Sequence, residues 1–282
     1  MSGPTDIIRP GELVRLAPGV HRLTAFNAGM MTGPGTNTWI LGEEKHAVLD
    51  PGPASPEHID NILAKAPGRV RWVLVTHTHP DHSPGAAPLA KRAGAQVIGP
   101  PPPPGPRQDQ SFKPEVLPGD EQELDLGGLV LQAICTPGHA SNHICWWLAA
   151  QGVLFTGDHV MQGSTVVIAP PDGDMSAYMA SLQRVLELPL RALAPGHGHW
   201  IERPRREIEA LISHRQGRER KVMAVLKTLG SATVGDMLAR VYDDVPEQLH
   251  PVAAQSLEAH LLKLEKDRMA LQHGNRWKPA VA

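Results

Sequence analysis

Four side chains that can bind a metal ion fall within six residues, in the segment 77–82 (HTHPDH). The segment follows Arg71–Val75, a short apolar and β-branched run that predicts a buried strand. Ser83 and Pro84 predict the N-cap and the first residue of a helix, and Gly94 predicts its C-terminal end. We therefore expect the segment on a strand-to-helix loop at the carboxyl end of a strand, where α/β folds bind ligands.

The chemistry of these four groups indicates more than one ion. Imidazole and carboxylate together suit zinc and other borderline divalent metals. Four such groups are too many for one ion that keeps an open coordination position. The sequence therefore favours two metals. A histidine-rich surface loop is the alternative interpretation.

Three further candidate ligands disfavour the surface-loop interpretation. His139, Asp158 and His197 each come shortly after a strand-like run, and each directly follows a glycine. Glycine permits a tight turn or a close approach of the backbone. The repetition of this pattern is typical of a metal-binding site and not of randomly placed surface histidines.

The order of these seven residues resembles the signature of the metallo-β-lactamase superfamily, in which His-x-His-x-Asp-His is followed by Gly-His, Asp and His. The resemblance covers the core of the chain up to His197. It implies a first metal held by His77, His79 and His139, a second held by Asp81, His82 and His197, and a bridging ligand, Asp158. β-Lactamases proper often carry a cysteine in the second site and lack this bridging aspartate. The chain thus looks like the hydrolase branch that includes glyoxalase II and the transfer-RNA 3′ processing nuclease.

The resemblance also implies a fold and a mechanism. The fold is an α/β, four-layer αβ/βα sandwich with the metals at one edge. The implied cofactors are two divalent ions. Zn²⁺ is the preferred ion, and Mn²⁺ and Fe²⁺ are also compatible with these ligands. A hydroxide that bridges the ions would attack a carbonyl or phosphoryl centre, and Asp81 would orient it.

Further residues are expected around the ligands. Asp50 stands at the end of a strand and is a candidate acceptor that fixes the tautomer of a ligating imidazole. Asn37, which the resemblance alone implies, and His143 and His199, which lie near proposed ligands in the sequence, are candidate substrate-binding residues. For the two histidines, a local hydrogen bond in a strand or loop is an equally good interpretation.

Composition favours an intracellular enzyme, for which we expect a cytoplasmic location and no membrane association. Among 282 residues, 41% are hydrophobic, yet no apolar run approaches the ~20 residues of a membrane helix. The N-terminus has no charged-then-apolar signal pattern. Cys135 and Cys145 lack metal-binding spacing and are interpreted as buried thiols. The proline-rich run 100–106 is expected to be a stiff surface connection.

The chain changes character after His197. A long helix is predicted over 204–229, followed by helices near 233–242 and 252–267 and a hairpin over 269–278 that turns at Gly274-Asn275. This is the winged-helix order, and it resembles the C-terminal domain of the β-lactamase-like protein 2 group, whose human member is a mitochondrial endoribonuclease. We expect a catalytic domain over 1–215 and a winged-helix-like domain over 216–282. Because the tail follows the last ligand, a chain that ends near Leu229 is expected to keep its metals.

Two substrate classes stay open. A phosphodiester, such as single-stranded RNA, suits two metals and a winged helix, and is the leading interpretation. The net charge of −2 and the isoelectric point of about 6.7 are weak support for nucleic-acid binding. A small-molecule ester, thioester or lactone is the alternative. A winged helix also serves as a dimerisation module, so a homodimer is compatible with the tail. A single-iron redox enzyme and a structural-metal module are disfavoured, because all seven ligand positions are present and structural zinc sites are closed and usually rich in cysteine.

Overall fold

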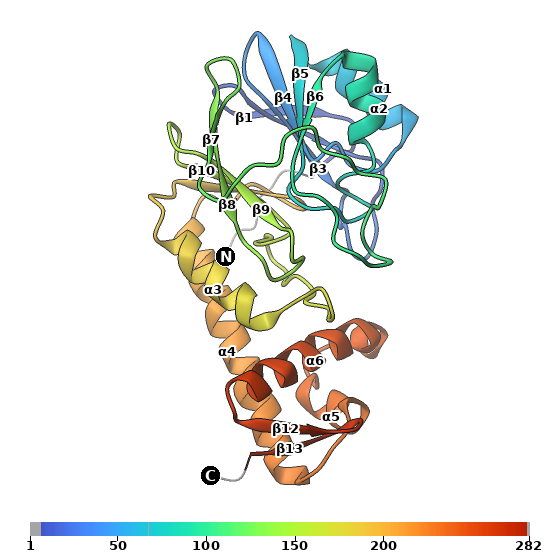
Figure 1. Ribbon diagram of the computed structural model, residues 1–282, viewed down its shortest axis with the longest axis vertical. Helices are drawn as coiled ribbons and strands as arrows, with labels where there is room; N and C mark the ends of the chain where they lie inside the picture. The colour runs from blue at the N-terminus through green and yellow to red at the C-terminus, as the bar shows by residue number, and fades with distance from the viewer. Residues whose placement is uncertain (1–6, 67, 281–282) are drawn as a thin grey trace. The chain divides into compact units, whose positions relative to one another are not determined.

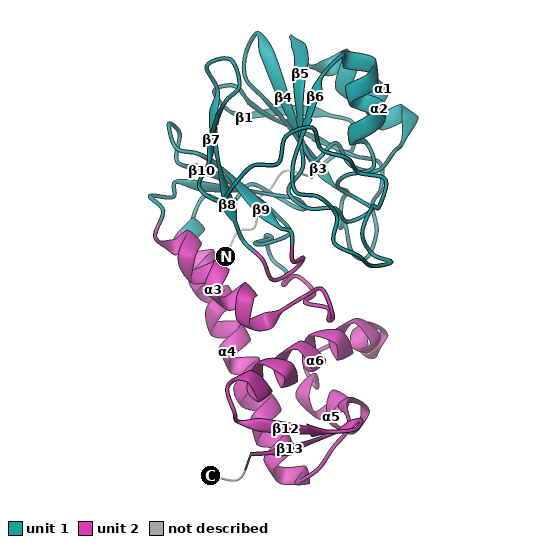
Figure 2. Ribbon diagram, viewed as in Figure 1, with its two compact units in different colours: residues 1–136, 142–164, 188–204 teal, residues 137–141, 165–187, 205–282 magenta. Residues whose placement is uncertain are grey.

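The computed structural model describes residues 7–66 and 68–280. The chain divides into two compact units (Figure 2). Unit 1 comprises Met1–Thr136, Asn142–Ser164 and Leu188–Pro204, and unit 2 comprises Pro137–Ser141, Thr165–Glu187 and Arg205–Ala282. The domain boundary expected between residues 215 and 216 stays a prediction.

Unit 1 contains two sheets that face one another (Figure 1). The first has six strands in sequence order, paired antiparallel from β1 to β4 and parallel from β4 to β6. Its strands are β1 (Leu13–Ala17), β2 (Val20–Thr24), β3 (Asn37–Leu41), β4 (Lys45–Leu49), β5 (Arg69–Leu74) and β6 (Gln96–Ile98).

The second sheet has the order β11-β10-β9-β8-β7, and only the β10–β11 pair is parallel. Its strands are β7 (Glu123–Asp125), β8 (Val130–Cys135), β9 (Ile144–Leu148), β10 (Val153–Gly157) and β11 (Ala192–Pro195). The expected strands before each candidate ligand are therefore present. The proline-rich segment 100–106 forms neither helix nor strand, as predicted.

The alternation of side chains in β3 divides the core of unit 1 into two layers. Trp39 points between the sheets, where its ring lies 5.6 Å from that of Phe155 on β10. Ile40, the next residue, points to the other face, where α1 (Pro56–Lys65) and α2 (Ala86–Ala93) cover the first sheet. The helices α1 and α2, the first sheet and the second sheet therefore form three successive layers within unit 1.

The start of α2 differs from the prediction. The helix begins at Ala86 with Gly85 as N-cap, so the assignment of Ser83 and Pro84 to these positions was wrong. Ser83 does not cap the helix because its hydroxyl donates to the carboxylate of Asp109 at 2.8 Å. Gly94 ends the helix in the left-handed conformation, as predicted.

Unit 2 contains the predicted winged-helix elements around their own apolar core. These elements are α4 (Pro204–Leu229, in unit 2 from Arg205), α5 (Val234–Val241), α6 (His250–Lys266), β12 (Ala270–His273) and β13 (Arg276–Pro279), with the short 3₁₀ helix η1 (Glu247–Leu249) before α6. Unit 2 also contains α3 (Met175–Leu186), which precedes them in the chain. Thr233 and Asp236 form a reciprocal capping box at α5. Gly274 has a φ of 61°, which suits the tight turn of the β12–β13 hairpin. Among the described residues, no helix has the length and apolar character needed to span a bilayer.

Candidate metal centre

The loop that follows β5 carries four of the seven predicted ligands, those of the segment 77–82. Asp50, directly after β4, anchors this loop. The Asp50 carboxylate accepts hydrogen bonds from the backbone N–H of Thr76 at 2.7 Å and from its hydroxyl at 2.8 Å. Asp50 is buried and has a positive φ of 51°, a conformation that non-glycine residues seldom adopt. The backbone strain at this position is consistent with a demanding structural role.

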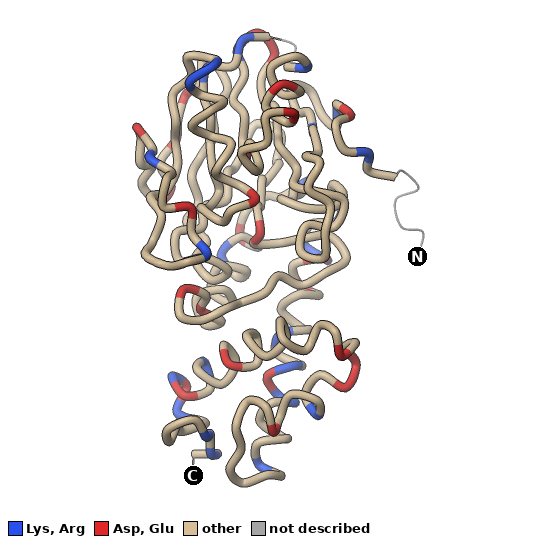
Figure 3. The backbone as a smooth tube through the Cα atoms, turned by 90° about the vertical axis from the view of Figure 1, so that its right-hand side faces the viewer, with Lys and Arg blue, Asp and Glu red and all other residues tan. Residues whose placement is uncertain are grey.

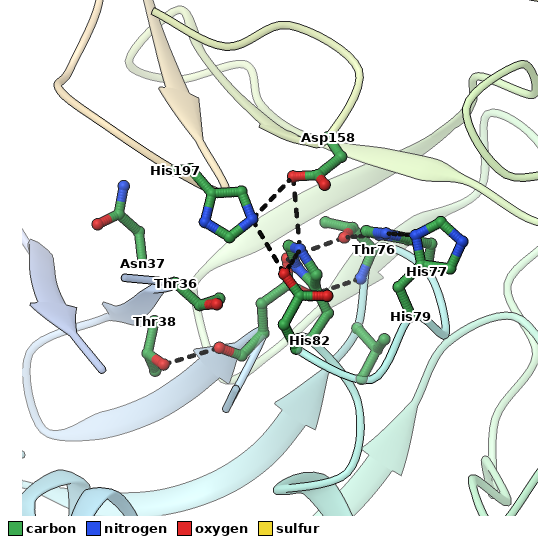
Figure 4. A network of polar contacts seen from close by, with 12 residues as sticks. Thr36, Asn37, Thr38, Thr76, His77, His79, His82, Asp158 and His197 are labelled. Atoms are coloured by element: carbon green, nitrogen blue, oxygen red, sulfur yellow. Dashed lines mark hydrogen bonds and ion pairs between the residues drawn. The ribbon is translucent and has the colours of Figure 1, made fainter. Parts of the chain in front are cut away.

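Four ligand candidates converge beside this loop. The ligand atoms of Asp81, His82, Asp158 and His197 all lie within 4.8 Å of one another. His197 Nε2 lies 3.1 Å from Asp81 Oδ2 and 3.4 Å from Asp158 Oδ1 (Figure 4). His82 Nε2 lies 3.5 and 3.4 Å from the same two oxygens. Two imidazole nitrogens and two carboxylate oxygens therefore face a common point.

This arrangement fits a divalent metal ion. The Nε2 atoms of His82 and His197 are buried and make no geometrically sound hydrogen bond within the described residues, although carboxylates lie close by. Two imidazoles and two carboxylates form a donor set that borderline divalent ions prefer. A metal at this point would satisfy atoms that the protein leaves buried without such bonds.

The electrostatics of the cluster are those of a cation site. Burial lowers the pKa of His82, but the carboxylates of Asp81, Asp158 and Asp50 outweigh it and raise this pKa well above its ordinary value. For His197, burial is likewise outweighed, chiefly by Asp158 and Asp81, and the pKa is raised. Burial acts to raise the pKa of Asp81, but His82 and His197 lower it overall. The carboxylates thus favour a positive charge in this position.

The Nδ1 atoms of His82 and His197, which point away from the cluster, each face a hydrogen-bond acceptor. His82 Nδ1 lies 3.0 Å from Asp50 Oδ2, which confirms the expected role of Asp50 as an acceptor. His197 Nδ1 lies 3.2 Å from the carbonyl oxygen of Gly35. With Nδ1 donating its hydrogen, the neutral form of each ring would present the lone pair of Nε2 to a metal ion.

Glycine is required directly before three of the candidate ligands. A Cβ at Gly138, whose φ is 148°, would stand 2.4 Å from the Cα of Tyr178. A Cβ at Gly157, whose φ is 46°, would stand 2.5 Å from Thr76 Oγ1, and one at Gly196 would stand 2.8 Å from Asp158 Oδ1. The close approach that the sequence pattern predicted is therefore present at all three positions.

The remaining predicted ligands lie in different units. In unit 1, His77 Nε2 lies 3.0 Å from His79 Nδ1, and His77 Nδ1 lies 3.0 Å from Thr76 Oγ1. In unit 2, His139 Nδ1 lies 2.7 Å from the carbonyl oxygen of Val167. If Nδ1 donates to this carbonyl, Nε2 would be the atom of His139 that binds a metal.

Two of the three predicted substrate-binding residues use their side-chain polar atoms in hydrogen bonds within the protein. The buried amide of Asn37 donates to the carbonyl oxygens of Pro195 at 3.0 Å and Gly198 at 2.8 Å, and its oxygen accepts from Thr24. Asn37 therefore holds the loop that carries His197 and has no free polar atom for a substrate.

The buried His143 has a similar structural place. Its Nε2 accepts from the backbone N–H of Asp158 at 3.2 Å, and its Nδ1 contacts Thr136 Oγ1 at 2.8 Å. It thereby orients the loop of Asp158, so a direct substrate contact is not supported. His199 is partly exposed, and its role stays a prediction.

Sequence reasoning missed two contributors to the site. Thr76 links Asp50 to the ligand loop, and its place directly before His77 was the available signal. Val167 contributes a backbone carbonyl, for which no sequence signal exists. Neither of the two cysteines forms a disulfide, and Cys145 is buried as expected, whereas Cys135 is only partly buried.

Comparison with known proteins agrees with this geometry. Residues 31–197 match the metallo-beta-lactamase superfamily, and residues 233–277 match the beta-lactamase associated winged helix domain. A beta-lactamase-like protein 2 homolog of Drosophila melanogaster is 31% identical, covering 90% of each chain. An atrochrysone carboxyl ACP thioesterase of Aspergillus fumigatus is 29% identical, covering 95% of this chain and 86% of its own.

Solved structures share the fold. A metallo-beta-lactamase family protein from Thermus thermophilus superposes with a TM-score of 0.79 at 21% identity, covering 94% of this chain and all of its own. A beta-lactamase domain protein from Burkholderia ambifaria gives a TM-score of 0.82 at 19% identity, covering 98% and 96%. The predicted α/β fold and its winged-helix domain are thereby confirmed. The chain belongs to the metallo-beta-lactamase superfamily of hydrolases.

Proposed function

We propose that the chain is a hydrolase that uses two divalent metal ions, with zinc preferred and Mn²⁺ or Fe²⁺ also compatible. The principal support is the buried cluster of two imidazoles and two carboxylates in unit 1. The proposed ligands are His77, His79 and His139 for the first ion, Asp81, His82 and His197 for the second, and Asp158 as the bridge. Divalent ions in such a site lower the pKa of water and polarise the oxygen of a scissile bond.

Within this proposal, Asp81 orients the attacking nucleophile. Its side chain is 28% exposed, whereas those of His82, Asp158 and His197 are 0%, 11% and 5% exposed, so Asp81 is the cluster member best able to face a substrate. The neighbouring imidazoles keep its pKa low despite burial, and the carboxylate therefore remains ionised. His199 is proposed to donate a proton to the leaving group.

For the substrate, we propose an ester or thioester of an acyl group. One supporting feature is the loop 26–36, which is anchored to the site where Gly35 accepts from His197. This loop exposes Phe26, Met30 and Met31 to solvent, and Met30 is 72% exposed. An apolar loop beside a metal site suits an acyl chain better than a phosphate backbone. A relative named as an ACP thioesterase is consistent with this chemistry.

A second supporting feature is the charge of α6, which occupies the place of a recognition helix. Glu258 is exposed and Glu265 is partly exposed on this helix. Its lysines are paired, Lys263 with Glu219 and Asp267, and Lys266 with Asp174. Figure 3 shows acidic and basic residues interspersed along the C-terminal helices. Such a surface gives little attraction for a polyanion.

A phosphodiester, with single-stranded RNA as the example, is the second candidate. It is favoured by the winged-helix match and by the exposed basic residues of α4, including Arg206, Arg220 and Lys227. A two-metal site can catalyse the hydrolysis of an ester as well as that of a phosphodiester, so the substrate class must be decided by experiment.

The test presents the metal-loaded protein with an acyl thioester, a lactone and end-labelled RNA in parallel, beside an Asp158→Asn variant. We expect metal-dependent hydrolysis of the acyl substrates, absent from the variant. Met30→Ser with Met31→Ser should raise KM for a long acyl chain more than for acetyl. Metal-dependent RNA cleavage without acyl hydrolysis would overturn the substrate proposal. It would move the assignment to phosphodiesters, and a steep decrease with salt would support that.

A further inference from the structure

The turn that carries His139 is embedded in unit 2. Nδ1 of His139 faces the carbonyl oxygen of Val167 at 2.7 Å. Three further contacts hold the same turn: Ser181 Oγ donates to the Pro137 carbonyl at 2.8 Å, the Asp174 N–H to the Gly138 carbonyl at 2.8 Å, and the Ser141 N–H to Asp172 Oδ2 at 3.2 Å. The position of His139 therefore depends on the segment 166–181.

That segment is in turn held by two helices of unit 2, α4 and α6. On α4, Arg215 donates from its guanidinium to the carbonyl of Val166, one residue before Val167. On α6, Ser256 Oγ accepts from the N–H of Ile168 at 3.4 Å, one residue after Val167. The Ile168 N–H belongs to the same peptide group as the Val167 carbonyl that faces His139, and Arg215 holds the preceding peptide group.

The two side chains are placed to act as fixed supports. Arg215 is 3% exposed and Ser256 is 6% exposed. The Arg215 guanidinium also lies over the ring of Tyr178, 5.4 Å from its centroid. A third and weaker contact joins Lys266 of α6 to Asp174, the N-cap residue of α3, at 2.5 Å. That pair is more exposed, so we expect it to contribute less.

We propose that Arg215 and Ser256 are positioning residues for a metal ligand: they fix the Val167 carbonyl that sets the tautomer and orientation of His139. This inference rests on the proposed role of His139 as a ligand. It gives helices α4 and α6 a part in orienting this ligand, independent of any contact with substrate. Acceptors of this kind typically change metal affinity by about 10–100-fold when they are disturbed.

The test measures stepwise binding of Zn²⁺ and Co²⁺ by chelator competition in the full-length protein, together with the Co²⁺ absorption spectrum and the urea unfolding of the metal-free protein. The variants are Arg215→Met and Ser256→Ala, with His139→Ala as reference. We expect His139→Ala to lose one ion. Both positioning variants should weaken the same ion about tenfold and alter its Co²⁺ bands, and Arg215→Lys should recover part of the affinity.

Arg218→Met is the matched control. Arg218 is a buried arginine on the same helix, and its guanidinium also donates to a backbone carbonyl, but that carbonyl belongs to Val241 at the end of α5. This variant should reduce the stability of unit 2 and leave metal affinity unchanged. Wild-type affinity and spectra in Arg215→Met and Ser256→Ala, with an effect in His139→Ala, would overturn the positioning role alone. An equal loss in Arg218→Met would also overturn it. Full binding of both ions by His139→Ala would refute the ligand assignment and this inference with it.

Discussion

The ligand candidates are supported in two different ways in the two units. In unit 1, Asp81, His82, Asp158 and His197 come from the ends of strands in both sheets, and a buried carboxylate, Asp50, holds the loop and one imidazole. In unit 2, the backbone carbonyl of Val167 faces His139. The candidate ligands of unit 1 are supported by charge, whereas His139 depends on the position of a peptide segment. Substitutions of carboxylates should therefore affect the unit 1 ligands, and substitutions in distant helices should affect His139.

The largest expected effect comes from removing a charge within the unit 1 cluster. Asp158→Asn keeps the shape of the side chain but removes a charge that faces His82 and His197. We expect turnover and the affinity for at least one metal ion to fall more than ~100-fold, because losses outside the ligand set alone cost 10–100-fold. Metal analysis and steady-state kinetics measure both quantities.

Asp125→Asn is the control for this change. Asp125 is an exposed carboxylate in the same unit that accepts from the N–H of Gly128 in a turn. It should leave metal content and activity unchanged. Full metal content and full activity in Asp158→Asn would remove the bridging role from the proposal.

Asp50→Asn is the counterpart in unit 1 of the Arg215 experiment. Asparagine tolerates a positive φ, so this variant tests the charge of Asp50 with little added backbone strain. We expect an affinity loss of about 10–100-fold for the ion held by His82. The ion held by His139 should be less affected. If both ions weaken equally, the supports of the two units are coupled, and the comparison fails.

The smallest expected effect is a pH dependence of stability in unit 1. Burial lowers the pKa of His58 to about 4, and the ring contacts Thr38, which donates to the carbonyl of Asp50. The unfolded chain takes up this proton near pH 6.5, so the stability is present above that pH and is lost as pH falls towards 4. We expect a loss of roughly 1 kcal/mol by pH 5.5.

Urea unfolding of the metal-free protein between pH 7.5 and 5.5 measures this loss. His58→Gln retains an N–H donor but does not titrate, so the difference between the two proteins isolates His58. Parallel pH profiles for the wild type and the variant would contradict the assignment.

Much of the fold could be predicted because the relevant signals are local. The hairpin of β3 and β4, the C-terminal end of α2 at Gly94 and the turn of the β12–β13 hairpin each follow from short patterns of apolar residues and glycine. The start of α2 was mispredicted for the opposite reason. Ser83 has a partner in Asp109, which is distant in sequence, and the local cap signal could not reveal it.

Residue types and their order alone identified the ligand set as a hypothesis and the superfamily as a resemblance, because metal chemistry restricts which side chains can serve. Tertiary structure decided which polar residues support those ligands. Asn37 and His143 were expected to touch substrate, but burial directs their polar atoms to the loops of His197 and Asp158.

The order along the chain also suggested that the tail could be removed without affecting the metals. That expectation stays a prediction, but in the folded chain Ser256 of α6 contacts the segment that faces His139. A hydrogen bond joins residues 88 positions apart there, and the acceptor of His139 is a backbone carbonyl, which every residue possesses. Ligand chemistry is thus determined by residue identity, whereas support by the backbone depends on which segments the fold brings together.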